Sequence, residues 1–301
     1  MKINVGIVGF GNLGKSLAEE IKQSDEFNLV AIFSRRNIKG TISYKKISSY
    51  KDKIQLLFLC GGSQNELELQ ALKNIKHFNI IECYDNHAKL NSFENKLNRL
   101  AQKNKKIALC SFGWDPGLFS LMRGIFDSLG YTPYTFWGKG MSQGHTQAIK
   151  QIDGVLDAME LTIPCEKIKK QIKSGAKITP SHLFHQRLCF VVSPKDKQKT
   201  VRENIINMPH YFKGYKTKVH FVCQKKLDRI KTLAHQGEVL TQNNVLNFSL
   251  KLPSNPKFTS KVMVCFARAF RQISNEKKYG AFTIFDFPIG YILKKNKFEY
   301  L

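Results

Sequence analysis

Two phosphate-binding motifs overlap near the start of the chain, in the segment Gly9-Phe10-Gly11-Asn12-Leu13-Gly14-Lys15-Ser16. Read as Gly-x-Gly-x-x-Gly, the segment is the dinucleotide fingerprint of a Rossmann domain. Read as Gly-x-x-x-x-Gly-Lys-Ser, it is a P-loop for nucleoside triphosphates. Both motifs hold phosphate oxygens on backbone N–H groups at the N-terminus of a helix. The first interpretation predicts a redox enzyme and the second predicts an NTPase.

The residues that end the next expected strands favour the dinucleotide motif. A P-loop enzyme also needs an Asp at the end of an apolar strand to organise Mg²⁺. The strand expected at 54–60 instead ends in Cys60-Gly61-Gly62, without a carboxylate. The strand expected at 29–33 runs into Ser34-Arg35-Arg36, where an NAD site would carry an acid for the ribose 2′-OH. Two guanidinium groups and a hydroxyl suit a 2′-phosphate, so the predicted cofactor is NADP(H) rather than NAD(H).

The expected cofactor site therefore combines the glycine turn with the ends of two later strands. In this interpretation Lys15 and Ser16 are helix residues that match a P-loop by coincidence. The expected contacts to NADP(H) are Gly9, Gly11, Asn12, Leu13, Gly14, Ser34, Arg35, Arg36, Cys60, Gly61, Gly62 and Ser63.

Length and composition predict a folded globular protein with room for two domains. The chain has 301 residues, of which 42% are hydrophobic, the usual range for globular domains. No apolar run approaches the roughly 18 residues of a membrane span. The N-terminus also lacks the apolar stretch and cleavage site of a signal peptide. We therefore expect a cytoplasmic protein with no membrane partner. Seven scattered cysteines without a Cys-x-x-Cys pair predict buried thiols in a reducing compartment.

The net charge of +25 raises the question of a nucleic-acid partner. The lysines, however, are spread along the whole chain, and no Arg-rich tract or zinc-finger pattern is present. We therefore expect no nucleic-acid site, although the positive field would attract a polyanionic cofactor or a dicarboxylate substrate. His182 and His185 are close in sequence but have no third ligand, so no metal site is expected.

Strands alternate with helices in the first third of the chain. Strands are expected at 2–8, 29–33, 54–60, 79–83 and 106–111. Helices are expected at 12–22, 67–72 and 87–102, the second of them after a capping box at 63–66. Alternation of this kind predicts a doubly wound parallel sheet, the Rossmann fold, in this part of the chain.

Strand-like runs predominate further along the chain. Asp115-Pro116 predicts a helix start, with Asp as N-cap and Pro at the first helical position, and a helix is expected at 118–129. Strands are then expected at 132–137, 158–163, 188–192, 218–222 and 245–252. Many of them alternate apolar and polar residues. This predicts an α+β domain with a mostly antiparallel sheet and helices on one face.

A helix at 258–273 and a strand at 281–285 are expected near the end of the chain. The predicted fold class is α/β, with an N-terminal doubly wound Rossmann domain followed by the α+β domain. The expected domains are a dinucleotide-binding domain at 1–115, onto which 258–301 packs back, and a substrate-binding domain at 116–257.

Three segments are rich in aromatic, glycine and hydrogen-bonding residues outside any helix period. They lie at 84–87, 112–117 and 135–145, and they contain the only two tryptophans of the chain, Trp114 and Trp137. Small-molecule pockets combine apolar walls with a few polar groups. The three segments are therefore expected to form the substrate site.

In these segments the chain resembles the meso-diaminopimelate dehydrogenase family. The family's Tyr-Asp-Asn-His, Gly-Trp-Asp-Pro-Gly and Thr-Phe-Trp-Gly-x-Gly-x-Ser-Gln-Gly-His segments stand at 84–87, 113–117 and 135–145. Further family blocks follow in order at 162–164, 187–192, 208–212 and 250–259, so the resemblance covers residues 1 to about 285. It implies NADP-dependent, reversible oxidative deamination of meso-2,6-diaminopimelate at its D-centre. The products would be L-2-amino-6-oxopimelate and ammonia.

The resemblance also implies a metabolic role and an assembly. In the reductive direction the reaction would supply diaminopimelate for lysine and peptidoglycan. The family forms homodimers, and we expect the second domain to form the dimer contact.

The reacting end of such a substrate carries an ammonium group. We expect Asp85 and Asp115 to attract it and to stabilise the iminium that forms as hydride leaves. Trp114 and Trp137 would wall the pocket and exclude water. Gln143 stands in a glycine-flanked segment with free backbone N–H groups, and it is expected to contact the substrate.

The resemblance implies that Thr162, Arg187, His235 and Asn255 bind the non-reacting L-end, with Arg187 as the fork for its carboxylate. Around His235 the family pattern is Met-Pro-His-Gly-Gly, whereas residues 233–237 here read Leu-Ala-His-Gln-Gly. The lost Pro and Gly change which backbone angles are easy. A related NADPH-dependent reductase or dehydrogenase of another amino or imino acid therefore stays open, as does the P-loop NTPase. Residues 287–301 lie beyond the resemblance.

Overall fold

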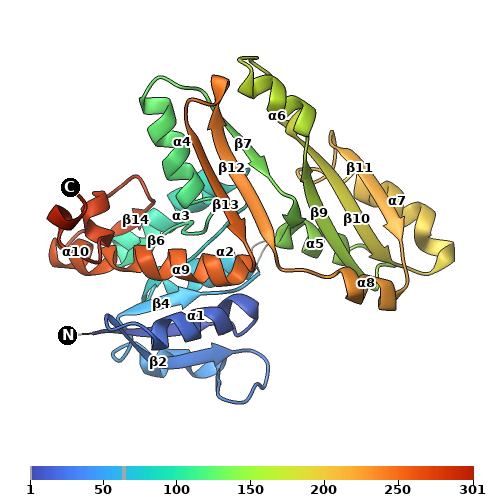
Figure 1. The fold of residues 1–301 in the computed structure, drawn as a ribbon. Helices are drawn as coiled ribbons and strands as arrows, with labels where there is room; N and C mark the ends of the chain where they lie inside the picture. Colours follow the sequence, from blue (N-terminus) through green and yellow to red (C-terminus); the bar gives the residue numbers. More distant parts are fainter. Residues whose placement is uncertain (1, 63–65) are drawn as a thin grey trace. The chain divides into compact units, whose positions relative to one another are not determined.

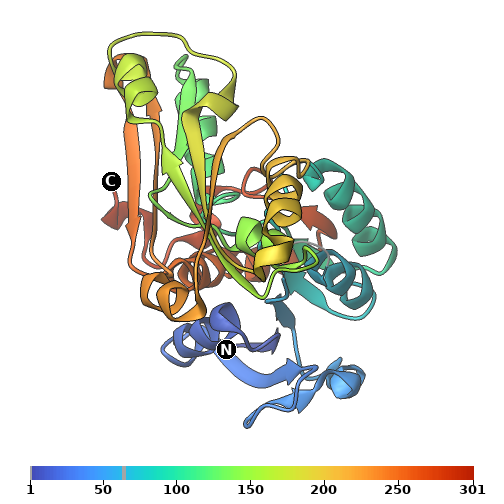
Figure 2. The same ribbon diagram turned by 90° about the vertical axis from the view of Figure 1, so that its right-hand side faces the viewer.

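The structure is a computed structural model that describes residues 2–62 and 66–301. The chain divides into two compact units, shown from two sides in Figure 1 and Figure 2. The first unit combines Met1–Leu121 with Pro256–Leu301, and the second comprises Met122–Asn255. The borders expected from the sequence lay after residues 115 and 257.

The first unit is built on a seven-stranded sheet in the order β14-β6-β5-β4-β1-β2-β3, and all its neighbouring strands are parallel. The strands are β1 (Ile3–Val8), β2 (Phe27–Ser34), β3 (Ile42–Ser43), β4 (Leu56–Leu59), β5 (Asn79–Ile81), β6 (Ile107–Leu109) and β14 (Gly280–Phe282). The order 3-2-1-4-5-6 of the first six strands is that of a dinucleotide-binding Rossmann fold. The seventh strand brings the C-terminal segment to the edge beside β6.

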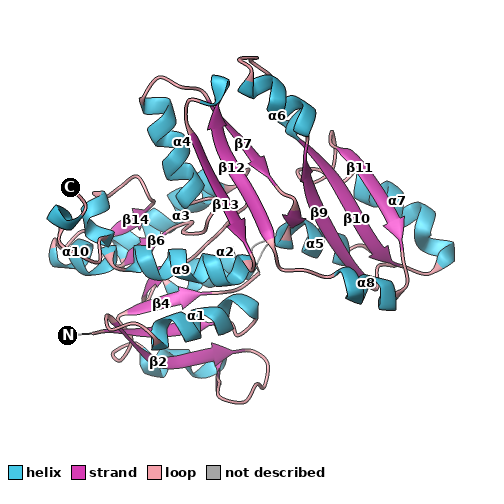
Figure 3. Ribbon diagram, viewed as in Figure 1, coloured by secondary structure: helices cyan, strands magenta, loops and turns pink. Residues whose placement is uncertain are grey.

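Helices cover both faces of this sheet (Figure 3). On one face lie α1 (Asn12–Lys22), α9 (Asn255–Ala267) and α10 (Ala269–Asn275); on the other lie α2 (Glu66–Asn74) and α3 (Leu90–Lys103). All residues of β4 are buried, as expected for a strand covered on both sides. The single helix expected at 258–273 is two helices, α9 and α10, which divide at Arg268.

The second unit contains two sheets rather than the one expected. A four-stranded sheet has the order β11-β10-β9-β8, and a three-stranded antiparallel sheet has the order β13-β12-β7. The strands are β7 (Pro133–Trp137), β8 (Gly140–Met141), β9 (Asp157–Pro164), β10 (His185–Val192), β11 (Lys216–Phe221), β12 (His235–Thr241) and β13 (Asn247–Leu252). Only β10 and β11 are parallel, because the helix α7 (Gln198–Ile206) crosses between them. The predicted fold class, a Rossmann domain followed by a mostly antiparallel α+β domain, is confirmed.

Helices pack on both sheets of the second unit. α5 (Gln143–Lys150) and α7 cover one face of the four-stranded sheet, and α8 (Gln224–Ile230) covers the other. α6 (Glu166–Lys173) packs against β7 and β12. Among the described residues of the chain, no helix is long and apolar enough to cross a membrane.

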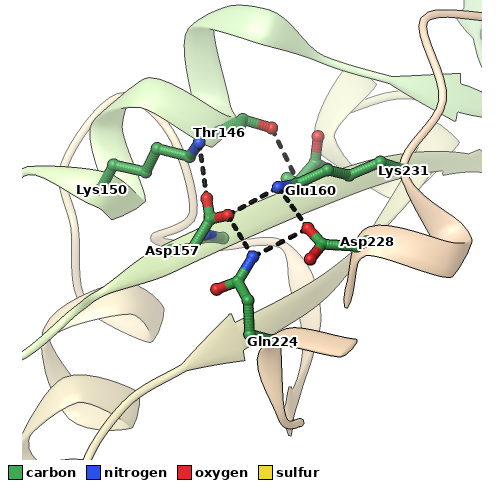
Figure 4. Close-up of polar contacts among 8 residues, drawn as sticks. Thr146, Lys150, Asp157, Glu160, Gln224, Asp228 and Lys231 are labelled. Atoms are coloured by element: carbon green, nitrogen blue, oxygen red, sulfur yellow. Dashed lines mark hydrogen bonds and ion pairs between the residues drawn. The ribbon is translucent and has the colours of Figure 1, made fainter. Parts of the chain in front are cut away.

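A polar network at the start of β9 ties α5 and α8 to the four-stranded sheet (Figure 4). The carboxylate of Asp157 accepts from Lys150 Nζ at 2.7 Å, from Lys231 Nζ at 2.7 Å and from Gln224 Nε2 at 2.9 Å. Asp228 also accepts from Lys231 Nζ and from Gln224 Nε2, each at 2.8 Å. Partial burial opposes the charged form, but hydrogen bonds from the two lysines and the glutamine outweigh it. They hold the pKa of Asp157 well below its usual range.

We expect Asp157→Asn to lower the free energy of unfolding by about 1–2 kcal/mol at neutral pH. Because the folded pKa lies below that of the unfolded chain, this stabilisation is present above about pH 4 and is lost as the pH falls further. Urea unfolding at neutral pH and near pH 3 measures both effects. Asp153→Asn is the matched control, because that carboxylate is 90% exposed and pairs with Lys197 outside this network. Superimposable curves for Asp157→Asn and the parent at neutral pH would contradict the prediction.

Candidate active site

The turn between β1 and α1 has the three glycine functions of a dinucleotide-binding turn. Gly9 has a φ of +97°, and a Cβ there would lie 2.8 Å from the carbonyl oxygen of Cys60. A Cβ on Gly14 would lie 2.0 Å from the carbonyl oxygen of Gly9, so α1 packs directly on the turn. An added Cβ on Gly11 would meet nothing within 4 Å, which leaves its backbone open to a ligand. The turn and the N-terminus of α1, where Asn12 and Leu13 begin the helix, fit a cofactor pyrophosphate.

The two residues that completed the P-loop pattern lie inside α1. The helix already begins at Asn12, so Lys15 and Ser16 are its fourth and fifth residues, and Ser16 is buried. In a P-loop these two residues stand where the loop enters the helix. This placement and the strand order favour the Rossmann interpretation over the NTPase.

The residues expected to read the 2′-phosphate stand at the end of β2. Ser34 is buried and its Oγ accepts from Arg36 N–H at 3.0 Å, which shapes the turn after the strand. Arg35 and Arg36 are exposed, and Arg35 forms an ion pair with Glu66 at the start of α2. Glu66 was not expected beside the cofactor site from the sequence. Its only sequence signal was its place as the acidic residue of the expected capping box.

The other expected cofactor residues follow β4. Cys60 continues the strand, since its N–H donates to the carbonyl oxygen of Val8 at 2.8 Å. Gly61 lies against Gln70, and Gly62 N–H donates to Glu66 Oε2 at 3.4 Å. Ser63 lies outside the described residues. In a parallel sheet the ends of β1, β2 and β4 meet along one edge, so the glycine turn, Ser34 and Cys60 share the carboxyl edge of the sheet.

The two expected catalytic carboxylates follow β5 and β6 along the same edge. Asp85 is exposed, and Asp115 is half-buried next to Trp114. The indole of Trp114 is buried and meets the ring of Phe119 edge-on, with centroids 5.1 Å apart. The predicted helix start at Asp115 is wrong, because Gly117 has a φ of +121° and the helix α4 (Leu118–Ser128) begins only after it. Capping therefore does not account for Asp115.

The four-stranded sheet of the second unit carries a buried polar cluster on its α5 face. Thr162 and Arg187 are direct neighbours on β9 and β10, and Arg187 Nη1 donates to Thr162 Oγ1 at 2.6 Å. Thr162 Oγ1 in turn lies 3.2 Å from both carboxyl oxygens of Glu160, which is 3.7 Å from Arg187 Nη1. The guanidinium of Arg187 lies 4.4 Å from the ring centroid of Tyr215. Glu160 was not among the expected site residues, and its one signal in the sequence was a carboxylate inside an apolar strand.

The charge of Arg187 is poorly compensated in this cluster. Burial raises the pKa of Glu160 to about 8, although Arg187 and a hydrogen bond from Thr162 oppose the shift. Burial thus weakens the ability of this carboxyl to balance the guanidinium charge. The guanidinium is only 5% exposed, and its Nε–H has no partner among the described residues. A buried cation with an unused donor is suited to bind a carboxylate.

Trp137 and His235 adjoin this cluster from the three-stranded sheet. The backbone N–H of Trp137 donates to His185 Nε2 at 2.7 Å, and the indole and imidazole rings stack with centroids 4.9 Å apart. Burial and the charge of Arg187 lower the pKa of His185 to about 3, so this histidine is a neutral core residue. His235 is buried and begins β12, a strand that was not expected from the sequence, and a Cβ on Gly140 would lie 2.5 Å from its Cα.

Two further expected substrate residues stand at helix starts. Gln143 is exposed and is the first residue of α5, after Ser142 as N-cap. Asn255 is the first residue of α9, and its N–H donates to the carbonyl oxygen of Leu233 at 2.8 Å, beside β12. Over residues 2–62 and 66–301, no group of three or more His, Cys, Asp or Glu side chains is arranged to hold a metal ion.

Known proteins resemble the chain over nearly its whole length. The family described as diaminopimelic acid dehydrogenase C-terminal domain matches residues 113–254. A relative from Ureibacillus thermosphaericus, named meso-diaminopimelate D-dehydrogenase, is 39% identical over 317 residues, covering 98% of this chain and 97% of the relative. The solved C. glutamicum DAP dehydrogenase in complex with DAP has a TM-score of 0.93 at 32% identity, covering 99% of this chain and 98% of that chain. An engineered D-amino acid dehydrogenase bound to NADP⁺ has a TM-score of 0.92 at 30% identity, with 99% and 98% covered.

These matches confirm the resemblance, which the sequence segments already indicated over residues 1 to about 285. Identity of this level over almost the full length, together with the shared fold, is decisive for membership. The chain belongs to the meso-diaminopimelate D-dehydrogenase family.

Proposed function

We propose that this protein is an NADP-dependent dehydrogenase of meso-2,6-diaminopimelate, which it converts reversibly to L-2-amino-6-oxopimelate and ammonia. The observation that carries the proposal is the buried Arg187 beside Thr162. Its guanidinium is positively charged, and its Nε–H has no hydrogen-bond acceptor among the described residues, so the group is suited to bind an anion. A substrate with a second, non-reacting carboxylate supplies that anion, whereas a simple amino acid does not. The glycine turn and Ser34-Arg35-Arg36 support the choice of NADP as cofactor.

Two sets of residues bind the two ends of the substrate, and the first set acts on the reacting end. The glycine turn and Ser34-Arg35-Arg36 would hold NADP⁺, which would supply the hydride acceptor for the D-centre. Asp85 and Asp115 hold the reacting ammonium group and stabilise the positive charge of the iminium that forms on the substrate. Trp114 and Trp137 each contribute apolar surface that limits the access of water to the imine.

The other end of the substrate has its own set of partners. Arg187 and Thr162 bind the carboxylate of the L-end, and His235, Asn255 and Gln143 complete the contacts. Because only one end meets the Asp pair, the two chemically identical amino acid ends are distinguished by position. The homodimer and the cytoplasmic location expected from the sequence stay predictions.

A comparison of the three isomers of diaminopimelate tests this function. With NADP⁺ and purified protein, we expect the meso isomer to produce NADPH and equimolar ammonia, because it alone combines a D-centre with an L-configured distal end. The LL isomer has no D-centre and is expected to give no signal, and the DD isomer only a weak one. No NADPH from the meso isomer, with NADPH binding intact by fluorescence, would overturn the proposal.

One observation favours a second substrate class. Ala234 and Gln236 replace the Pro and Gly that flank this histidine in the family pattern, and Gln236 is part of β12. A panel of D-amino acids in the same assay decides between the classes. A monocarboxylic D-amino acid that is oxidised faster than meso-diaminopimelate would favour the related dehydrogenase.

A further inference from the structure

We propose that Glu82 is a positioning residue, whose carboxylate holds together the two segments that carry Asp85 and Asp115. The proposal rests on the function proposed above, in which these two aspartates hold the reacting amino group. Glu82 follows β5, directly before the Cys83-Tyr84-Asp85 segment. Nothing in the sequence distinguishes it from an ordinary polar residue at the end of a strand.

The side chain of Glu82 bridges the ends of two neighbouring strands. It is completely buried, and one carboxyl oxygen accepts from Tyr84 N–H in its own segment. The other oxygen accepts from Ser111 N–H at 3.0 Å, in the segment after β6. The backbone of Glu82 also pairs with that segment, donating to Leu109 O at 3.0 Å and accepting from Phe112 N–H at 2.8 Å. Glu82 therefore continues the sheet ladder beyond the two strands.

The geometry after β6 explains why Ser111 matters for Asp115. Ser111 has a φ of +62°, a left-handed conformation that is unfavourable for a residue with a Cβ. From there the chain closes a compact turn, in which Gly113 N–H donates to the carbonyl oxygen of Pro116 at 2.9 Å. Asp115 lies inside this turn, so a shift at Ser111 moves its carboxylate. On the other segment, Tyr84 is the residue directly before Asp85.

Two backbone donors need an ionised carboxylate. An ionised carboxylate accepts strongly from both N–H groups, whereas an amide presents a donor on one side and a protonated acid keeps only a weakened acceptor there. Burial raises the pKa of Glu82 to about 7, against the two backbone hydrogen bonds, and the nearby Asp85 raises it further. The other titratable groups that face it are the thiols of Cys83 and Cys110, whose own pKa values are raised by burial. None of the described groups that shift it is a cation.

This environment makes the ionised form costly to the fold. Because the folded pKa is raised above that of the unfolded chain, the contribution of Glu82 to stability falls as the pH rises from about 4.5 to 7. A group retained at such a cost fits a role in the site rather than in stability. The ionised form, present above about pH 7, is the one that fixes both aspartate segments.

The test compares Glu82→Gln with Glu82→Asp in the full-length protein. Glu82→Gln is isosteric but replaces one acceptor by a donor, so we expect kcat for meso-diaminopimelate to fall about 10- to 100-fold at pH 8. The Kd for NADPH is expected to stay within about twofold, because the glycine turn is untouched. Glu82→Asp keeps the charge and is expected to recover part of the loss. In the parent, kcat is expected to fall below about pH 7, and Glu82→Gln is expected to lack this acid limb.

Glu26→Gln is the matched control, because Glu26 precedes β2 at the opposite edge of the same sheet and pairs with Arg268 at 2.7 Å. Hydrogen exchange supplies a readout that needs no substrate. In Glu82→Gln, amides in peptides covering 82–88 and 110–118 are expected to exchange about tenfold faster, and those elsewhere in the chain are expected not to change. The parent is expected to show the same local loss of protection at pH 6 relative to pH 8, after correction for intrinsic rates.

The two proposals fail in different ways. If the parent does not oxidise meso-diaminopimelate but Glu82→Gln still loosens both peptides, the proposed function fails and the positioning role stands. Unchanged exchange in both peptides, with kcat and its pH profile like those of the parent, would overturn the role of Glu82. If Glu82→Gln does not fold, the exchange of the parent at pH 6 and pH 8 decides: equal protection at both overturns the proposal.

Discussion

Asp115→Asn is expected to lower kcat for meso-diaminopimelate about 100- to 1,000-fold while leaving the Kd for NADPH unchanged. The substitution preserves the size of the side chain and removes only its charge. In the proposed function that charge stabilises the iminium as it forms, so the loss is expected in the chemical step more than in substrate binding. The Asp115 carboxylate is half-buried at the carboxyl edge of the Rossmann sheet, where an electrostatic interaction is stronger than in water. Steady-state kinetics with saturating NADP⁺ measure the effect.

Asp127→Asn provides the matched control for this prediction. Asp127 lies on α4, the helix that follows Asp115, but it is exposed. The same change of charge there is expected to leave kcat within about twofold of the parent, because an exposed charge is screened by water and salt. Circular dichroism of both variants is the check that they fold. A folded Asp115→Asn variant with the parental kcat would remove Asp115 from the reaction.

The Rossmann half of the fold was predictable because its signals are local. β1 runs directly into a glycine turn whose spacing is diagnostic, and β4 is a continuous apolar run. The second unit has weaker local signals. β8 has two residues, and β12 begins with His235-Gln236-Gly237, which shows no alternation of apolar and polar residues. The division of its strands into two sheets depends on pairings far apart in sequence, which periodicity does not report.

In the site, too, residues within local motifs could be predicted, whereas residues defined by contacts distant in sequence could not. Trp114 and Asp115 could be recognised from a local motif, but Glu82 and Glu160 could not. Each is a carboxylate beside or within an apolar strand, and only packing shows that water is excluded from it. The contact between Thr162 and Arg187 likewise depends on the register of β9 and β10. Family resemblance indicated these two residues, whereas only the structure shows that their buried neighbour is Glu160.

The double substitution Arg35→Ala with Arg36→Ala is expected to raise the KM for NADPH about 100-fold while changing kcat less than about threefold. Both guanidinium groups stand at the end of β2, where the ribose of a bound dinucleotide would lie. A 2′-phosphate carries up to two negative charges, and each charge-assisted hydrogen bond contributes about 1.5–3 kcal/mol. The KM for NADH, which has no such phosphate, is expected to change little. The ratio of the two KM values is therefore the readout.

The ion pair between Arg35 and Glu66 makes this prediction sharper. Bound 2′-phosphate competes with the Glu66 carboxylate for the same guanidinium, so Glu66→Gln is expected to lower the KM for NADPH and leave that for NADH unchanged. Arg99→Ala with Lys103→Ala is the matched control, because these exposed residues of α3 remove the same net charge from the same unit. A parent that uses NADH and NADPH equally well would contradict the 2′-phosphate argument. A control variant with the same rise in KM would attribute the effect to the overall field of this strongly basic chain rather than to contacts at the end of β2.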